Sequence, residues 1–309
     1  MKATAFEPTR SPERPGPGPL PETLLRALEI DVRRRMEGLL AGDHRSAVLG
    51  VGTELAQVRP YQVGDDVRQI DWNVTARTGE AHVRVQIAER VLVTWLVLDL
   101  SPSMAFGTAD RRKADVAEGV ALAVAHVASR RGNRIGIVAF GDGPTRTLPP
   151  RQGRVGMLGT LLALRGLPTG PPGPPATLAA SLGWTAAVAK QRSAVLVVSD
   201  FRGPHDWRDQ LLRLAGHHEV MAVEIRDPRE QELPSVGELW LVDPESARLV
   251  RVDTSNSRLR QRFASAAASE RDDVAAALAG IGVRHVVLST SGDWLRTLAG
   301  FLRRHGARG

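Results

Sequence analysis

Continuous apolar runs alternate with longer amphipathic segments through most of the chain after residue 90. An apolar run of four to eight residues, rich in β-branched side chains, indicates a strand that is buried on both faces of a sheet. The runs that predict buried strands are 91–98, 134–140, 194–199, 220–225 and 285–288. Apolar residues at helical spacing predict helices over 110–131, 154–164, 177–191, 205–215, 257–278 and 293–304. A further pair of strands is predicted at 238–242 and 248–252.

This alternation predicts a doubly wound α/β fold with a mostly parallel, Rossmann-like sheet. Buried strands joined by helices form right-handed crossovers, which place helices on both faces of the sheet. In such sheets ligands bind beyond the carboxyl ends of the strands, where the strand order reverses. We therefore expect any functional chemistry directly after Leu98, Phe140 or Ser199.

The first third of the chain has a weaker pattern. Residues 1–20 are rich in proline and glycine, a composition that predicts a disordered tail. A helix is predicted over 21–40, and residues 50–89 form a polar, turn-rich stretch with a strand candidate at 81–87. The predicted organisation is a tail (1–20), an N-terminal helix with a small strand-containing extension (21–89) and the α/β domain (90–309).

Composition excludes several classes of protein. The chain has no cysteine, so it has no disulfide and no thiolate zinc site. The net charge is +7, but the basic residues are dispersed and aromatic residues make up only 4%, which does not favour specific nucleic-acid binding. No apolar segment reaches the roughly 18–20 residues of a membrane span, and the N-terminus lacks the apolar core of a secretory signal. We therefore expect a cytoplasmic protein without a transmembrane segment.

Oxygen-bearing side chains follow the ends of two predicted strands. Asp99, Ser101 and Ser103 form a D-x-S-x-S motif after the first strand, Asp200 follows the third, and Thr177 precedes a helix. Carboxylates and hydroxyls without histidine or cysteine suit a hard cation and do not favour zinc. Each residue could instead be a helix cap or turn former. Their joint placement at strand ends favours a metal site.

These five residues resemble the metal-ion-dependent adhesion site of the von Willebrand factor A fold. In that family an Asp-Ser-Ser loop, a Thr loop and a second Asp bind Mg²⁺ directly or through water. A carboxylate from a partner protein often completes the coordination. The resemblance implies Mg²⁺, with Mn²⁺ or Ca²⁺ as alternatives, at these five side chains. Phe201 departs from the pattern, because many adhesion-type domains have glycine at this position.

An upstream segment, RPYQVGDDVRQIDW at 59–72 followed by Ala76 and Arg77, is more distinctive. It resembles the signature of a bacterial family called domain of unknown function 58, in which this segment precedes a von Willebrand factor A-like domain. Genes of that family often neighbour MoxR-type AAA+ ATPases, which implies such an ATPase as partner. Many members carry N-terminal membrane helices, whereas this chain shows none. The signature residues are Arg59, Tyr61, Gly64, Asp65, Asp66, Arg68, Asp71, Trp72 and Arg77.

The alternating Asp and Arg residues of this segment allow three interpretations. They could form an acid cluster for hydrolysis or a surface for a partner. We favour ion pairs that fix an extended segment against the sheet domain, because opposite charges alternate around Tyr61, Ile70 and Trp72. On this interpretation Asp71→Ala lowers the melting temperature.

Three functions remain open at this point. We expect a non-enzymatic, metal-dependent protein–protein interaction module that acts as an adaptor or chaperone-like partner of a MoxR-type AAA+ ATPase. The first alternative is a metal-dependent phosphoester hydrolase. No histidine lies in a nucleophile-elbow or H-E-x-x-H context, no Walker A sequence occurs, and no general base is evident. The second alternative is a basic protein bound to nucleic acid or a membrane surface.

Overall fold

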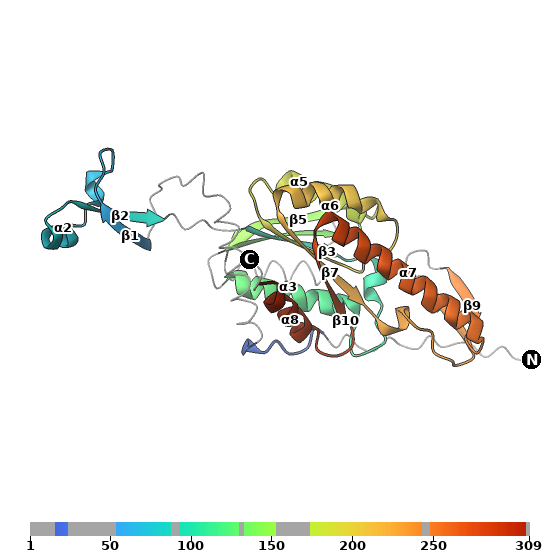
Figure 1. The fold of residues 1–309 in the computed structure, drawn as a ribbon. Coiled ribbons are helices and arrows are strands. Elements are labelled where there is room, and N and C mark those ends of the chain that lie inside the picture. The colour runs from blue at the N-terminus through green and yellow to red at the C-terminus, as the bar shows by residue number, and fades with distance from the viewer. Residues whose placement is uncertain are drawn as a thin grey trace, which may run out of the picture. The chain divides into compact units, whose positions relative to one another are not determined.

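The computed structural model describes residues 16–23, 54–87, 93–129, 133–152, 174–242 and 248–306 (Figure 1). The chain divides into two compact units. Residues 36–91 form one, here called the signature unit, and residues 1–35 with 92–309 form the other, here called the sheet unit. Of the helix predicted over 21–40 only residues 21–23 are described. The helix predicted over 154–164 lies outside the described residues.

A six-stranded sheet is the centre of the sheet unit, in the order β10-β7-β6-β3-β4-β5. All neighbouring strands are parallel except β4 and β5, which are antiparallel. The mostly parallel sheet of the prediction is thus confirmed, but β5 was not predicted, because it holds two prolines and no apolar run. The strands are β3 (Val93–Asp99), β4 (Arg134–Phe140), β5 (Arg146–Gln152), β6 (Ala194–Ser199), β7 (Glu219–Arg226) and β10 (Arg284–Ser289).

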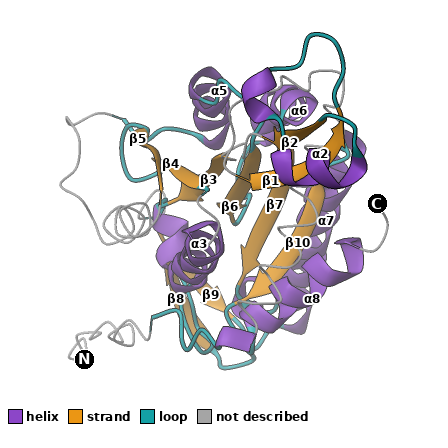
Figure 2. Cartoon of the chain, turned by 90° about the vertical axis from the view of Figure 1, so that its left-hand side faces the viewer, coloured by secondary structure: helices purple, strands orange, loops and turns teal. Residues whose placement is uncertain are grey.

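Helices cover both faces of this sheet (Figure 2). On one face α3 (Lys113–Ser129) and α8 (Trp294–Gly306) pack on the sheet. On the other face lie α5 (Leu178–Val188), α6 (Arg208–His217) and α7 (Ser257–Ile281). Successive strand residues point to opposite faces, so an apolar run fills both cores. In β3, for example, Leu96 joins one core and Val97 the other.

The strand order reverses beside β3. The chain runs from β3 through α3 to β4 on one side, and later places β6 on the other side of β3. Such a switch point leaves a crevice beyond the carboxyl ends of the two strands, where helices leave toward opposite faces. Asp99 ends β3, and Asp200 directly follows β6. The fold therefore brings the two predicted carboxylates to one crevice.

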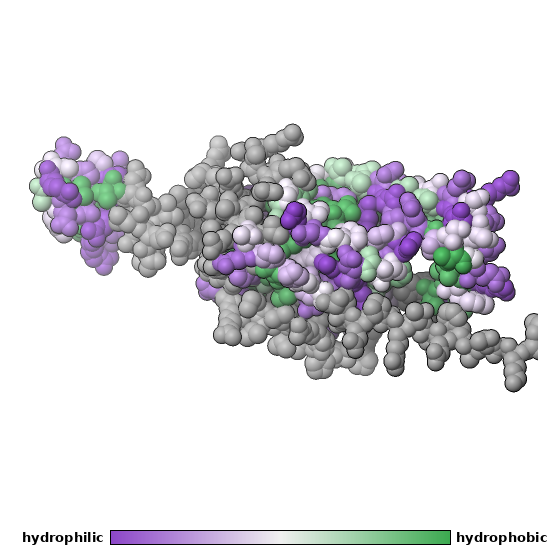
Figure 3. Space-filling view, turned by 90° about the horizontal axis from the view of Figure 1, so that it is seen from below, coloured by the Kyte–Doolittle hydropathy of each residue, from purple (hydrophilic) through white to green (hydrophobic). Residues whose placement is uncertain are grey.

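A separate antiparallel pair, β8 (Glu238–Val242) and β9 (Leu249–Asp253), lies before α7, as predicted. Its alternating pattern leaves Trp240, Val242 and Leu249 exposed. Figure 3 shows hydrophobic residues among hydrophilic ones at the end of the molecule where Figure 1 draws β9. The pair extends the sheet unit without joining its central sheet.

The signature unit contains two antiparallel strands, β1 (Glu54–Pro60) and β2 (His82–Ile87). A 3-10 turn (Val67–Gln69) and the short helix α2 (Trp72–Thr78) connect them. The strand candidate at 81–87 corresponds to β2. Neither β1 nor α2 was predicted, because both are short and largely polar and neither carries a long apolar period.

Residues 16–20 belong to the sheet unit. The indole Nε1 of Trp294 donates a hydrogen bond of 3.0 Å to the carbonyl of Pro17, and Leu20 packs against the core. The disorder predicted for residues 1–20 therefore does not extend to residues 16–20. The described residues contain no helix of the length and apolar content required to cross a membrane.

Candidate metal site

The first part of the site is the D-x-S-x-S loop at the end of β3. Asp99 Oδ1 accepts a hydrogen bond of 2.9 Å from the backbone N–H of Ser101, which folds the loop back on the strand end. Ser101 directly precedes a 3-10 turn (Pro102–Ala105), and its hydroxyl lies 3.1 Å from the hydroxyl of Ser103. The loop thus gathers one carboxylate and two hydroxyls within a few residues.

Gly141 allows the neighbouring strand end to approach this loop. It follows β4 with a φ of 99°, and a Cβ added there would lie 2.6 Å from the backbone N of Ser101. A side chain at this position would therefore push the Ser101 loop away. This close approach depends on the pairing of β3 with β4, so it was not predicted from sequence.

The second carboxylate loop starts at Ser199, the last residue of β6. The Ser199 hydroxyl donates to Asp99 Oδ2 at 2.5 Å and accepts from the N–H of Phe201 at 3.0 Å. Asp200 Oδ1 accepts from the N–H of Arg202 at 3.2 Å. Ser199 therefore ties the two strand ends together, although sequence analysis did not single it out.

Phe201 adopts the backbone conformation that glycine would favour. Its φ is 53°, the only positive φ of a non-glycine residue among the described residues. Such a conformation is strained for a bulky side chain. Burial offsets the strain, because the ring is 1% exposed and stacks edge-on against Trp207 at 5.5 Å. The turn of the second loop is thus kept without the glycine of the related pattern.

Thr177 is the N-cap of α5, and its hydroxyl accepts from the N–H of Ala180 at 3.2 Å. The same hydroxyl retains a proton and a second lone pair for a ligand or water. All five predicted ligands line one cavity of about 580 Å³. The structure thus brings the predicted residues together at the switch point: Asp99, Ser101, Ser103, Thr177 and Asp200.

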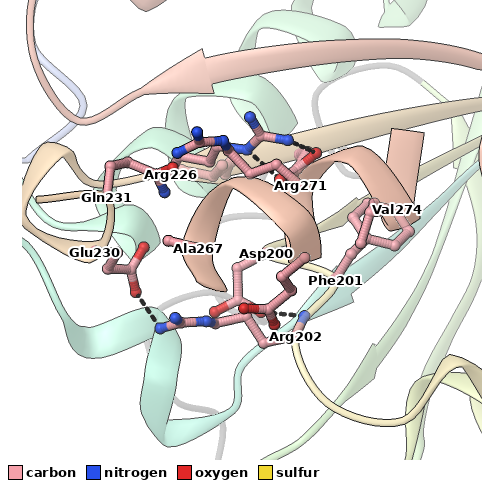
Figure 4. A pocket seen from close by; sticks show the side chains of 12 residues that line it. Asp200, Phe201, Arg202, Arg226, Glu230, Gln231, Ala267, Arg271 and Val274 are labelled. Carbon is pink, nitrogen blue, oxygen red and sulfur yellow. Dashed lines mark hydrogen bonds and ion pairs between the residues drawn. The ribbon is translucent and has the colours of Figure 1, made fainter. Parts of the chain in front are cut away.

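A buried lysine lies next to the second carboxylate. Lys113, at the start of α3, is fully buried, and its Nζ donates to Asp200 Oδ2 and to Glu230 Oε1, each at 2.6 Å. Arg202 Nη1 donates to the same Glu230 oxygen at 2.9 Å. Figure 4 shows the Arg202 guanidinium pointing at the Glu230 carboxylate, beside Asp200. Neither Lys113 nor Glu230 was predicted from sequence as part of the site, although lysine is rare in this arginine-rich chain.

Asp227 holds the surroundings of this lysine in place. It is fully buried, and its carboxylate accepts hydrogen bonds from Thr108, Thr290 and the N–H of Arg229. Burial alone would raise the pKa of Asp227, but these hydrogen bonds outweigh it and the pKa is lowered. Its own N–H donates to Glu230 Oε2 at 3.2 Å. Asp227 therefore fixes Glu230 and the loop before α3.

Asp99 carries a charge that the protein does not neutralise. Burial, and then repulsion by Asp200, raise the pKa of Asp99 to about 6, against the hydrogen bonds from Ser101 and Ser199. In the described part of the chain no cationic side chain is paired with it. A carboxylate that is destabilised in this way is relieved either by a proton or by a cation.

The donor set fits a hard cation. Adjacent oxygens around an octahedral Mg²⁺ lie about 2.9 Å apart, and the hydroxyls of Ser101 and Ser103 are 3.1 Å apart. Asp99 accepts hydrogen bonds from neutral groups of Ser101 and Ser199, and a carboxylate has further lone pairs for a metal. No cluster of three His, Cys, Asp or Glu side chains suitable for a metal occurs among the described residues. The site would therefore rely on hydroxyls and water beside its two carboxylates.

The signature residues pair within their own unit. Arg59 binds Asp65 at 2.7 Å, and Arg68 binds Asp66 at 3.1 Å. Asp71 caps α2 through the N–H groups of Asn73 and Val74, and its partner Arg84, at 2.9 Å, comes from β2 outside the segment. The remaining signature residues take backbone or surface roles: Tyr61 donates from its N–H to the carbonyl of Ala81, Gly64 has a φ of 110°, Trp72 is exposed, and Arg77 donates to the carbonyl of Asn73.

A family model described as "Protein of unknown function DUF58" matches residues 57–273. This match covers both the signature segment and the strand ends that carry the cavity. The chain belongs to this family. The match thus bears out the family resemblance of the signature segment.

Several relatives share most of the chain. Proteins from Mycobacterium tuberculosis and Mycobacterium bovis, both described as uncharacterized, are 42% identical over 286 residues, 92% of this chain and 90% of theirs. Two solved structures are more distant. BatB from Bacteroides thetaiotaomicron is 13% identical with a TM-score of 0.45, and an aerotolerance-related membrane protein from Bacteroides fragilis is 12% identical with a TM-score of 0.44. Each covers 71% of this chain and 100% of its own.

Proposed function

We propose that this chain is a metal-dependent protein-interaction module of the von Willebrand factor A type. The observation that carries the proposal is the convergence of five oxygen-bearing side chains, from three separate segments, on one cavity at the switch point of the sheet. Those side chains belong to Asp99, Ser101, Ser103, Thr177 and Asp200. A cation bound in the cavity would stabilise the uncompensated charge of Asp99.

Each residue has a distinct part in this proposal. Asp99, Ser101 and Ser103 would hold Mg²⁺ from the β3 loop, whereas Thr177 and Asp200 would face it from the loops of α5 and β6. When bound, the ion neutralises Asp99 and offers a coordination position to an anionic ligand. The mouth of the cavity is open, with Asp206 and Glu270 exposed at its lining. A side chain from a partner protein could therefore reach the ion.

The metal itself is tested by calorimetric titration of MgCl₂ and MnCl₂ into the wild type and Asp99→Ala. The wild type is expected to bind one divalent ion, and the variant to lose at least tenfold in affinity, because the charged ligand is gone. A matched control is Asp66→Ala, which removes an exposed carboxylate of the signature unit. Equal binding by wild type and Asp99→Ala contradicts the assigned ligands.

The partner is the second half of the proposal. The family's gene neighbourhood implies a MoxR-type AAA+ ATPase, for which this chain would be an adaptor or chaperone-like partner. The test is binding of the purified ATPase from the same organism to the immobilised chain, in Mg²⁺ and in EDTA. Binding that requires Mg²⁺ and is lost in Asp99→Ala supports the proposal. Binding that persists in EDTA places the contact elsewhere on the chain.

A further inference from the structure

Lys113 stands out among the basic residues of the chain. Only three of the 41 basic residues are lysines, and Lys113 is fully buried whereas Lys190 is exposed. A buried ammonium requires compensating charge, which Lys113 finds in Asp200 and Glu230. These two acids lie 87 and 117 positions further along the chain. The ammonium is therefore part of the tertiary structure of the candidate site.

The charges at the site divide into two groups. Lys113 and Arg202 face Asp200 and Glu230, so two cations meet two carboxylates. Asp99 stands outside this balance, because its partners are the neutral groups of Ser101 and Ser199. A divalent ion that enters the site therefore meets one uncompensated buried negative charge, whereas water screens the exposed Asp206 and Glu270 at the mouth. One positive charge would remain in excess.

We propose that Lys113 is a built-in cation that limits the metal affinity of this site, so that a divalent ion is retained firmly only when an external anion completes its coordination. The inference rests on the proposed metal site and identifies Lys113 as the residue that sets its metal affinity. Lys113 occupies one oxygen of Asp200 and repels an incoming cation across a buried region of low dielectric. An excess positive charge in such a region is unfavourable until an anion neutralises it. Metal binding and partner binding are thereby coupled through one fixed charge.

The same arrangement defines the chemistry of the partner. Its contact group must be anionic, as in a carboxylate side chain, because a neutral ligand would leave the excess charge in place. Lys113 is a positioning residue here, since it contacts Asp200 and Glu230 and reaches the ion through Asp200. Its effect should appear in metal affinity measured without any partner.

The experiment is calorimetric titration of MgCl₂ alone into four proteins. They are the wild type, Lys113→Met, Lys113→Gln, and Lys190→Met as the exposed control. Methionine has an unbranched, flexible side chain like that of lysine, but it carries no charge. Lys113→Gln removes the positive charge but keeps an N–H donor for Asp200 or Glu230, so it serves as the second variant if Lys113→Met does not fold.

Both Lys113 variants are expected to bind Mg²⁺ at least tenfold more tightly than the wild type, and Lys190→Met should equal the wild type. A second readout is the increase in melting temperature on adding Mg²⁺, which should be larger in both Lys113 variants. Unchanged or weaker Mg²⁺ binding by folded Lys113→Gln overturns the inference, and the proposed metal site still stands if the wild type binds Mg²⁺. Absence of Mg²⁺ binding in the wild type and in every variant instead contradicts the proposed function itself.

Discussion

A buried ion-pair cluster in the sheet unit contrasts with an exposed ion pair in the signature unit. In the sheet unit Lys113, Asp200 and Glu230 have side chains that are 0%, 4% and 8% exposed. In the signature unit the Arg68–Asp66 pair is 87% and 41% exposed. Water and salt screen the exposed pair, whereas the buried charges depend on one another. The buried cluster joins segments that are distant in the sequence, whereas the exposed pair lies within one turn.

The largest expected effect comes from the loop that carries Asp200. Phe201→Ala removes a buried ring and keeps the strained φ, so we expect a loss of about 3–5 kcal/mol in the free energy of unfolding. Phe201→Gly removes the same ring but relieves the strain, and should cost about 1 kcal/mol less than the alanine variant. Urea denaturation of the two variants measures the difference. A glycine variant less stable than the alanine variant would show that the backbone is not strained at this position.

The charge of Asp99 gives the next largest effect, and it depends on pH. Its pKa of about 6 in the folded state lies above the 3.8 of an ordinary aspartate side chain. The folded protein therefore holds this proton more tightly than the unfolded chain. The penalty of ionisation is absent below pH 3.8, grows as the pH rises to about 6, and reaches roughly 3 kcal/mol above that. Asp99→Asn removes the penalty.

In EDTA, Asp99→Asn should therefore be more stable than the wild type at pH 7.5, and its advantage should shrink as the pH falls toward 4.5. Urea denaturation of both proteins across this range measures it. Parallel stability profiles of the two proteins would mean that Asp99 is not under electrostatic stress. The same variant should bind Mg²⁺ more weakly, so that a gain in stability accompanies a loss of binding.

The smallest effects belong to the signature unit. Asp71 is nearly buried, caps α2 and pairs with Arg84, so Asp71→Ala should lower the melting temperature and speed hydrogen exchange at Asn73 and Val74. The hydrogen bond with Arg84 and those from the backbone hold the pKa of Asp71 below its usual range. Asp66→Ala breaks only an exposed pair and a 3-10 cap, and should change the melting temperature less. An equal decrease in melting temperature for the two substitutions would show that Asp71 contributes no more to stability than the exposed Asp66.

The alternation of strands and helices could be predicted from sequence, because a strand that is buried on both faces requires a continuous apolar run. The runs at 134–140 and 194–199 coincide with β4 and β6. The D-x-S-x-S motif and Asp200 were found in the same way, since each directly follows such a run. A local pattern therefore determined the predicted ligands and the edge of the sheet where they lie.

Only the tertiary structure determined which residues contact the predicted ligands. Lys113 faces Asp200 and Glu230 because α3, the end of β6 and the turn after β7 converge, and no pattern within α3 indicates that contact. The close approach of Gly141 to Ser101 likewise requires β3 and β4 to be paired. Periodicity along a sequence records which side of an element is buried. The charge and shape of the group across the interface depend on how distant segments pack, and only the folded chain specifies them.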